Sequence, residues 1–289
     1  MEKVLITGAN GFFASRFIDF YKSRYEVTGL SHRQLDITDL DQAVGVIKAN
    51  KPEYIVHAAA ISDTTMCQNN PELSQAVNVR GAVNVAKAAE ACNAKLIFLS
   101  SDQVYIGNAG QGPYKEPDEV NPYNVYGRHK LNAEAGILEL TQQAIALRIT
   151  WLFGLPERNK KINSNLVWNI AKSIMKNQPV SFPVNDYRGV TYVYELIEKM
   201  EEIFHLPGGI YNAGSENDLN VYELAQAVFK ALGLEGRIEG LLLKEFRDKP
   251  RDLRISNQKL KASGITFSSS EAAISKCIAD FSFSMKLPV

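Results

Sequence analysis

Short apolar runs alternate with longer amphipathic stretches over the first half of the chain. The runs predict buried strands, at residues 3–7, 25–30, 54–60, 95–99 and 144–149. The stretches between them predict helices, at residues 12–21, 39–50, 72–91 and 122–143. The strands show no polar alternation, so both faces of their sheet must be covered. Strands and helices in this order predict an α/β fold with a doubly wound parallel sheet of the Rossmann type.

The regular alternation weakens beyond about residue 152. Prolines at 156, 179, 183 and 207 separate shorter elements. Helical patterns return near residues 162–177, 192–205, 221–233 and 269–281. We therefore expect a dinucleotide-binding Rossmann domain over residues 1–151 and a smaller α/β substrate lobe over residues 152–289. Some segments of the lobe are expected to return to the first domain.

Composition excludes several classes of protein. With 289 residues the chain can bury a large core without disulfides or structural metals. Lys plus Arg and Asp plus Glu are both 32, which argues against a nucleic-acid partner because phosphates need a basic excess. No apolar run approaches the roughly 18 residues of a transmembrane helix, and the strand-like start is unlike a signal peptide. Three scattered cysteines support neither a disulfide framework nor a metal site, so we expect a cytoplasmic setting.

A glycine-rich segment joins the first predicted strand to the first predicted helix. Gly8 allows a tight turn, Gly11 lets the backbone approach a pyrophosphate, and the small Ala14 lets the helix pack close to the strand. The phosphates would then lie on free N–H groups at the positive end of the helix. This placement predicts a dinucleotide site.

The end of the second strand selects between the two nicotinamide dinucleotides. An acid there binds the ribose 2′-hydroxyl of NAD, whereas a basic residue accepts the 2′-phosphate of NADP. The chain carries Ser31 and Arg33 here and has no acid before Asp36. We expect Arg33 to pair with the phosphate and Ser31 to donate to it, which favours NADP(H) and leaves NAD(H) as the alternative.

Tyr126 and Lys130 lie four residues apart, on one face of the predicted helix 122–143. Reduction of a ketone by hydride leaves an alkoxide that needs a proton, and a phenol has an ordinary pKa of about 10. Lowering that pKa to about 7 requires roughly 4 kcal/mol of phenolate stabilisation, which a nearby ammonium can supply. Ser101 follows the strand 95–99, where ligands bind in parallel sheets, and is expected to orient the carbonyl oxygen.

These residues lie within motifs that resemble the extended short-chain dehydrogenase/reductase superfamily, and within it the dTDP-4-dehydrorhamnose reductase family. The resemblance covers nearly the whole chain and rests on segments in the family order: residues 7–11, 35–39, 56–60, 77–81, 99–105, 113–116, 125–130 and 151–154.

The resemblance implies a role for each matching position. Ser101, Tyr126 and Lys130 would be the catalytic set, and Tyr126 and Lys130 would also contact the cofactor. Other cofactor contacts would come from Gly8, Asn10, Gly11, Phe12, Phe13, Ser31, Arg33, Asp36, Ile37, Ala58, Ala59, Ala60 and Asn78. Asp36 and Ile37 would flank the adenine, and Asn78 would be a structural or water-holding partner near the lysine. The substrate contacts would come from Asp102, Trp151, Arg188 and Arg251.

Several positions depart from the family pattern. Ala14 replaces the third glycine, His129 replaces a usual serine, and Val190 and Glu195 stand where proline and aspartate are common. Gln103 stands where the rhamnose enzymes commonly have tyrosine, and it cannot act as the second carboxylate of a dehydratase. None of these changes removes a catalytic group.

The resemblance implies an NADPH-dependent reductase of a nucleotide-diphospho-4-keto-6-deoxy sugar, in the class of oxidoreductases that act on CH–OH groups. One alternative is a nucleotide-sugar epimerase of the same superfamily. Another is a non-catalytic NADP-binding regulatory subunit similar to that of methionine adenosyltransferase. The expected partner is the nucleotide sugar, with no membrane partner, and the resemblance also allows a homodimer.

Overall fold

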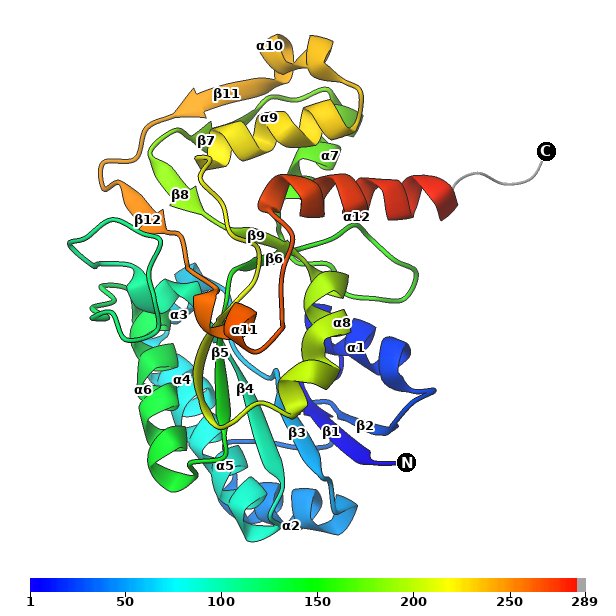
Figure 1. Ribbon diagram of the computed structural model, residues 1–289, viewed down its shortest axis with the longest axis vertical. Coiled ribbons are helices and arrows are strands. Elements are labelled where there is room, and N and C mark those ends of the chain that lie inside the picture. Colours follow the sequence, from blue (N-terminus) through cyan, green and yellow to red (C-terminus); the bar gives the residue numbers. More distant parts are fainter. Residues whose placement is uncertain (285–289) are drawn as a thin grey trace. The chain divides into compact units, whose positions relative to one another are not determined.

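The computed structural model contains a six-stranded sheet with strand order β10-β5-β4-β3-β1-β2 (Figure 1). Its strands are β1 (Lys3–Thr7), β2 (Glu26–Leu30), β3 (Tyr54–His57), β4 (Lys95–Ser101), β5 (Ile145–Ile149) and β10 (Gly209–Ala213). The pairs from β2 through β1, β3 and β4 to β5 are all parallel. The predicted α/β class with a parallel Rossmann-type sheet is confirmed.

The chain divides into two compact units, and the structure describes residues 1–284. Unit 1 comprises Met1–Ala109, Glu116–Ile149 and Ile197–Asn212, and it contains nearly all of the sheet. Unit 2 comprises Gly110–Lys115, Thr150–Leu196 and Ala213–Val289. The lobe predicted from the sequence runs to residue 289, and its last five positions, 285–289, lie outside the described residues.

Helices cover both faces of the sheet in unit 1. The helical elements of unit 1 up to residue 140 are α1 (Phe12–Tyr21), α2 (Leu40–Asn50), α3 (Thr64–Asn69), α4 (Pro71–Gln75), the π-helix η1 (Ala76–Gly81), α5 (Ala82–Ala91), the 3-10 turn η2 (Asp102–Tyr105) and α6 (Val125–Leu140). On one face α5 packs between α2 and α6 (Figure 1). Its alanines Ala82, Ala86 and Ala89 are fully buried in this core, and such small side chains allow close helix packing.

An aromatic cluster forms the core on the other face of the sheet. Phe17 of α1 contacts Phe204, the last residue of α8 (Val193–Phe204), with ring centroids 6.4 Å apart. Tyr54 of β3 stacks on the same Phe204 ring at 4.6 Å. The part of α8 that belongs to unit 1 therefore covers this face of the sheet together with α1.

Unit 2 is built from three short parallel strand pairs and several helices. The pairs are β6 (Trp151–Phe153) with β9 (Val190–Tyr192), β7 (Val180–Pro183) with β11 (Leu242–Glu245), and β8 (Asp186–Arg188) with β12 (Arg251–Leu253). The helices are α7 (Leu166–Lys176), α9 (Val221–Ala231), η3 (Glu235–Arg237), α10 (Ile238–Leu241), α11 (Gln258–Ala262) and α12 (Ser270–Ser284).

Four predicted elements of the first half of the chain differ from the structure by more than a shift of one residue at an end. The predicted strand 54–60 ends at His57, because the amide of Ala59 donates to the Thr7 hydroxyl at 3.2 Å instead of continuing the ladder. The predicted strand 95–99 continues to Ser101. The predicted helix 72–91 contains the π-helical turn η1. The predicted helix 122–143 occupies only Val125–Leu140, because the Asn124 side chain caps its first turn.

Within residues 1–284 the structure has no helix with the length and apolar character that a membrane crossing requires.

His57 is a buried histidine at the end of β3, opposite Thr7, the residue that precedes Gly8 of the glycine loop. Its Nδ1 lies 2.8 Å from the Thr7 hydroxyl, and its ring stacks on Phe98. Its Nε2 has no hydrogen-bond partner among the described residues. Burial, with a smaller contribution from the positive charge of Lys130, lowers the pKa of His57 to about 3. The folded protein therefore holds this imidazole neutral.

This burial predicts acid sensitivity of the fold. The unfolded chain takes up a proton at His57 below pH 6.5, whereas the folded chain does so only near pH 3. The free energy of unfolding should therefore fall as the pH is lowered across this window, by up to about 1.4 kcal/mol per pH unit from this group. In His57→Asn the slope, measured by denaturant unfolding at several pH values, should be shallower. His32→Asn removes an exposed histidine and should keep the parent slope. Equal slopes in the parent and His57→Asn would contradict the prediction.

Candidate active site

The three predicted catalytic residues lie in unit 1, at the end of β4 and in the first turns of α6. Ser101 is the last residue of β4, Tyr126 is the second residue of α6, and Lys130 follows one turn later. All three side chains are largely buried, with exposed fractions of 7%, 8% and 3%. A serine hydroxyl, a phenol and an ammonium are thus withdrawn from bulk water within one region of unit 1.

The Lys130 ammonium is held by the backbone of β4. Its Nζ donates to the carbonyl oxygen of Leu99 at 2.7 Å and lies 5.8 Å from the centre of the Tyr126 ring. The same Nζ lies 4.6 Å from the centre of the Phe98 ring. Burial lowers the pKa of Lys130 to about 8, and the negative charge of Glu134 opposes that shift. The amine therefore stays mostly protonated at neutral pH beside the phenol.

Ser101 stands at the junction of β4 and the turn η2. Its hydroxyl accepts from the amide of Gln103 at 3.2 Å and donates to the Asp102 carboxylate at 3.2 Å. Gln103 in turn accepts from the Asn124 side chain at 2.9 Å, and Asn124 caps α6 by accepting from the amide of Gly127. A series of hydrogen bonds therefore connects the end of β4, which carries Ser101, to the start of α6, which carries Tyr126.

Gln103 and Asn124 were not singled out from the sequence as site residues. The sequence does carry a signal for Asn124, because an asparagine directly before a helical pattern is a typical N-cap. Its second bond, to Gln103, depends on the fold and has no local signature.

Asn78 holds the loop that follows β3. It lies inside the π-helix η1 and is almost fully buried. Its side chain accepts from the amide of Ile61 at 2.8 Å and donates to the carbonyl of Ile61 at 2.9 Å. It also donates to Ser74, whose hydroxyl contacts His129, the neighbour of Lys130. In this structure Asn78 is thus a support for the loop that begins with Ala58, Ala59 and Ala60.

The glycine loop has the backbone that a pyrophosphate site requires. Gly8 adopts φ +71°, in the left-handed region, and a Cβ there would lie 2.9 Å from the Cα of Ala59. Gly11 caps α1 without any side-chain cap bond, and the first turn of α1 holds no acidic residue. The amides at the start of this helix are therefore left for an anion. Phe12 and Phe13 bury their side chains, so only their backbone could face a dinucleotide, whereas Asn10 is exposed.

The end of β2 presents an exposed guanidinium. Arg33 is exposed, while Ser31 donates its hydroxyl to Gln34 at 2.7 Å. Asp36 accepts from both the amide and the hydroxyl of Thr38, and these bonds lower the pKa of its carboxyl. The buried Ile37 follows it. Arg33 is therefore the group at this strand end that is most open to a phosphate.

The predicted substrate residues are divided between the units. Asp102 lies in unit 1, almost fully buried beside Ser101, whereas Trp151, Arg188 and Arg251 lie in unit 2. The Arg188 guanidinium lies 5.2 Å from the centre of the Trp151 ring, so the structure brings these two together. Arg251 instead pairs with the buried Asp186, and its Nε donates to that carboxylate at 3.0 Å.

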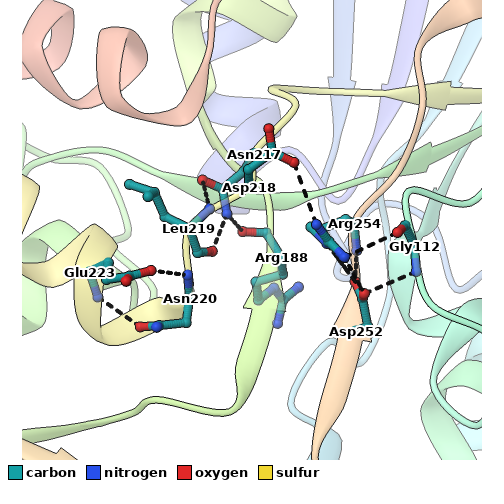
Figure 2. Close-up of polar contacts among 9 residues, drawn as sticks. All are labelled: Gly112, Arg188, Asn217, Asp218, Leu219, Asn220, Glu223, Asp252 and Arg254. Carbon is teal, nitrogen blue, oxygen red and sulfur yellow. Dashed lines mark hydrogen bonds and ion pairs between the residues drawn. The ribbon is translucent and has the colours of Figure 1, made fainter.

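Arg254, three residues after Arg251, is held by several acceptors. Figure 2 shows its guanidinium donating to Asp252 and to the carbonyl of Gly112, and also facing Asp218. The Asp252 carboxylate also accepts from the amide of Gly112 at 2.9 Å. The Asp252–Arg254 ion pair thus binds both the N–H and the carbonyl of Gly112, which fixes the loop Gly110–Lys115 within unit 2. Figure 2 also shows Arg188, whose backbone carbonyl accepts a hydrogen bond from the Asn217 side chain.

Residues 1–284 contain no group of three or more His, Cys, Asp or Glu placed to hold a metal ion.

Comparisons with known proteins place this geometry in a family context. A family model described as the RmlD substrate binding domain matches residues 1–283. The dTDP-4-dehydrorhamnose reductase of Aggregatibacter actinomycetemcomitans is 33% identical over 241 residues, which cover 79% of this chain and 79% of the relative. Methionine adenosyltransferase 2 subunit beta of Bos taurus is 30% identical over 246 residues, covering 81% of this chain and 73% of the relative.

A solved structure has the same fold. The dTDP-4-dehydrorhamnose reductase of Bacillus anthracis, determined in complex with NADP, superposes with a TM-score of 0.86 at 24% identity. The match covers 96% of this chain and 98% of that one.

The glycine loop yields a stability test. In Gly8→Ala the added Cβ meets the backbone of Ala59, in the loop after β3, while φ stays positive. The variant should therefore lose at least about 1–2 kcal/mol of unfolding free energy. Gly45→Ala is the matched control, because Gly45 lies within α2 with nothing near its Cβ position and should gain about 0.5–1 kcal/mol. Denaturant unfolding of both variants measures these changes. A Gly8→Ala protein as stable as the parent would show that the loop is free to rearrange.

Proposed function

The chain belongs to the RmlD substrate binding domain family, and on that premise we propose that it is an NADPH-dependent reductase of a nucleotide-diphospho-4-keto-6-deoxy sugar. It is thus an NAD(P)-dependent oxidoreductase similar to the dTDP-4-dehydrorhamnose reductases. The observation that carries the proposal is the buried Lys130 ammonium, 5.8 Å from the centre of the Tyr126 ring, in the same region as Ser101.

Bound NADPH would supply the hydride that reduces the keto carbon. The residues of the chain have three tasks beside it. Tyr126 gives its proton to the carbonyl oxygen, and the Lys130 ammonium stabilises the phenolate that this leaves. Ser101 donates a hydrogen bond to the same oxygen, since its hydroxyl hydrogen can rotate from Asp102 to the substrate. General acid catalysis of this kind contributes about 10²–10⁴-fold to the rate.

The glycine loop and the end of β2 are the elements proposed to hold the cofactor. The free amides at the start of α1, after Gly8 and Gly11, suit the pyrophosphate. The exposed Arg33 suits the 2′-phosphate of NADP, with Ser31 beside it, while Asp36 and Ile37 flank the adenine. Ala58–Ala60 would line the cleft and Asn78 would support them, and Lys130 would bind the nicotinamide ribose.

The substrate contacts proposed in unit 2 suit a nucleotide diphosphate. The Arg188 guanidinium and the Trp151 ring form a cationic and aromatic pair that can bind a phosphate and a base. Arg251 keeps further donors for a phosphate while it pairs with Asp186, because a guanidinium has five N–H groups. In unit 1 the carboxylate of Asp102, which already accepts from the Ser101 hydroxyl, would accept from a sugar hydroxyl.

A second candidate function is that of a non-catalytic regulatory subunit. It is favoured by the 30% identity with methionine adenosyltransferase 2 subunit beta. Such a protein would bind the cofactor and a partner enzyme without turning over a sugar.

Tyr126→Phe tests the reductase directly. The variant lacks the proton that the reaction needs, so kcat for NADPH oxidation with dTDP-4-dehydrorhamnose should fall at least about 10²-fold while NADPH still binds. Tyr222→Phe, a half-buried tyrosine of α9, is the matched control and should keep parental activity. An epimerase would show no net oxidation of NADPH. No turnover by the parent with any keto-sugar nucleotide, together with tight capture of a partner enzyme, would favour the regulatory subunit.

Arg33→Ala tests the choice of cofactor. Loss of a charge-assisted bond worth about 1.5–3 kcal/mol should raise the Kd for NADPH by roughly 10- to 100-fold and leave the Kd for NADH nearly unchanged. Fluorescence titration measures both constants, and Arg237→Ala in unit 2 serves as the control. Equal weakening of both dinucleotides would contradict a 2′-phosphate contact.

A further inference from the structure

A buried ion pair lies one helical turn beyond the catalytic lysine. Glu134 of α6 and Arg148 of β5 expose only 2% and 3% of their side chains. The Arg148 guanidinium donates from Nη2 to Glu134 Oε2 at 2.8 Å and from Nε to both carboxylate oxygens at 3.2 Å. A pair this deeply buried is tolerated only when its remaining donors and acceptors are satisfied as well.

Neighbouring polar groups complete the hydrogen bonding of the pair. The Ser100 hydroxyl donates to Glu134 Oε1. Arg148 Nη1 donates to the Tyr105 hydroxyl at 2.9 Å, and Tyr105 donates to the Asn212 side chain at 2.9 Å. The network therefore joins β4, η2, α6, β5 and β10, which are the elements around the end of the sheet that carries Ser101.

Three consecutive residues at the end of β4, Leu99 to Ser101, belong to this arrangement. The carbonyl of Leu99 accepts from Lys130, the hydroxyl of Ser100 donates to Glu134, and Ser101 follows. Lys130 and Glu134 are four residues apart and so lie on the same face of α6. The two side chains thus fasten α6 to adjacent positions of β4, directly before the catalytic serine.

The Glu134 carboxylate also opposes the cost of burying the Lys130 ammonium. Burial alone favours the neutral amine, and the nearby negative charge favours the ammonium. The Arg148 guanidinium pairs with this carboxylate from the side of β5. The titratable groups that face Lys130 from the surrounding elements are His57, Cys67 and Tyr126, and Arg148 faces Glu134. Arg148 also contacts the Tyr105 hydroxyl.

We propose that Glu134, anchored by Arg148 and Ser100, is a positioning residue that keeps Lys130 in its charged form and fixes the end of β4 at Ser101. The effect of Glu134 on catalysis rests on the proposed function. The effect of Glu134 on the charge of Lys130 is independent of that function, since this charge can be followed without substrate or cofactor.

Glu134→Gln tests the proposal with little change in shape. The amide can still accept from Arg148 and donate to Ser100, but the negative charge is gone. The titration of Lys130 is followed by NMR on protein with ¹³Cε-labelled lysine, and the Lys130 signal is identified by its loss in Lys130→Arg. The midpoint for Lys130 should fall by about one pH unit or more from that of the parent.

Glu139→Gln is the matched control, because Glu139 is an exposed glutamate of the same helix. It should leave the Lys130 titration unchanged, whereas a merely structural role of Glu134 would change stability without moving this midpoint. A folded Glu134→Gln protein whose Lys130 titrates as in the parent overturns the proposal. If the single variant does not fold, Glu134→Gln with Arg148→Gln removes both buried charges. A lower Lys130 midpoint in this double variant then supports the proposal, and an unchanged one overturns it.

The rate profile separates this inference from the proposed function. If the chain is a reductase, the alkaline limb of its kcat/KM profile should move to lower pH in Glu134→Gln by the same amount as the NMR midpoint. A parent protein without turnover contradicts the reductase and leaves the titration result standing. A reductase whose Lys130 midpoint and alkaline limb both stay in place in Glu134→Gln contradicts only the role of Glu134.

Discussion

Burial of the Lys130 ammonium is the constraint around which this end of the sheet is arranged. An ammonium withdrawn from water needs an acceptor and a compensating charge. The carbonyl of Leu99 is the acceptor, and the Glu134 carboxylate supplies the charge. Both depend on α6 lying against the last residues of β4. The same placement puts the phenol of Tyr126 beside the ammonium, so the contacts that stabilise the buried charge also assemble the proposed acid–base pair.

Irregular backbone surrounds this charged centre on the side of the glycine loop. Gly8 has a positive φ, β3 stops at His57 where Thr7 takes up the next amide, and the π-helix η1 carries Asn78. Such departures from regular structure are costly and cluster at functional sites. Here each one opens a turn or holds a loop at the same end of the parallel sheet. The regular core of unit 1, with its alanine-rich α5 and its aromatic cluster, supports these irregular segments.

The sequence alone predicts the sheet class and the positions of Ser101, Tyr126 and Lys130, because these depend on local periodicity and on the strand ends. Glu134 and Arg148 were missed although each leaves a trace: Glu134 continues the four-residue spacing of Tyr126 and Lys130, and Arg148 is a lone charge inside the apolar run 144–149. Neither trace identifies the partner, which is fixed only when β5 lies beside β4. The end of β3 and the π-helical turn are likewise accompanied by tertiary contacts, to Thr7 and to Ile61, that no local pattern encodes.

The edge strand β10 has a consequence for how the protein is made. It borders β5, yet it reaches the sheet only after the chain has passed through residues 150–196 of unit 2 (Figure 1). On the ribosome, β5 is therefore synthesised about sixty residues before its outer neighbour, and for that interval the nascent chain presents an open strand edge. Open edges can pair with other chains, so this interval of synthesis is one in which the nascent chain is exposed to aggregation.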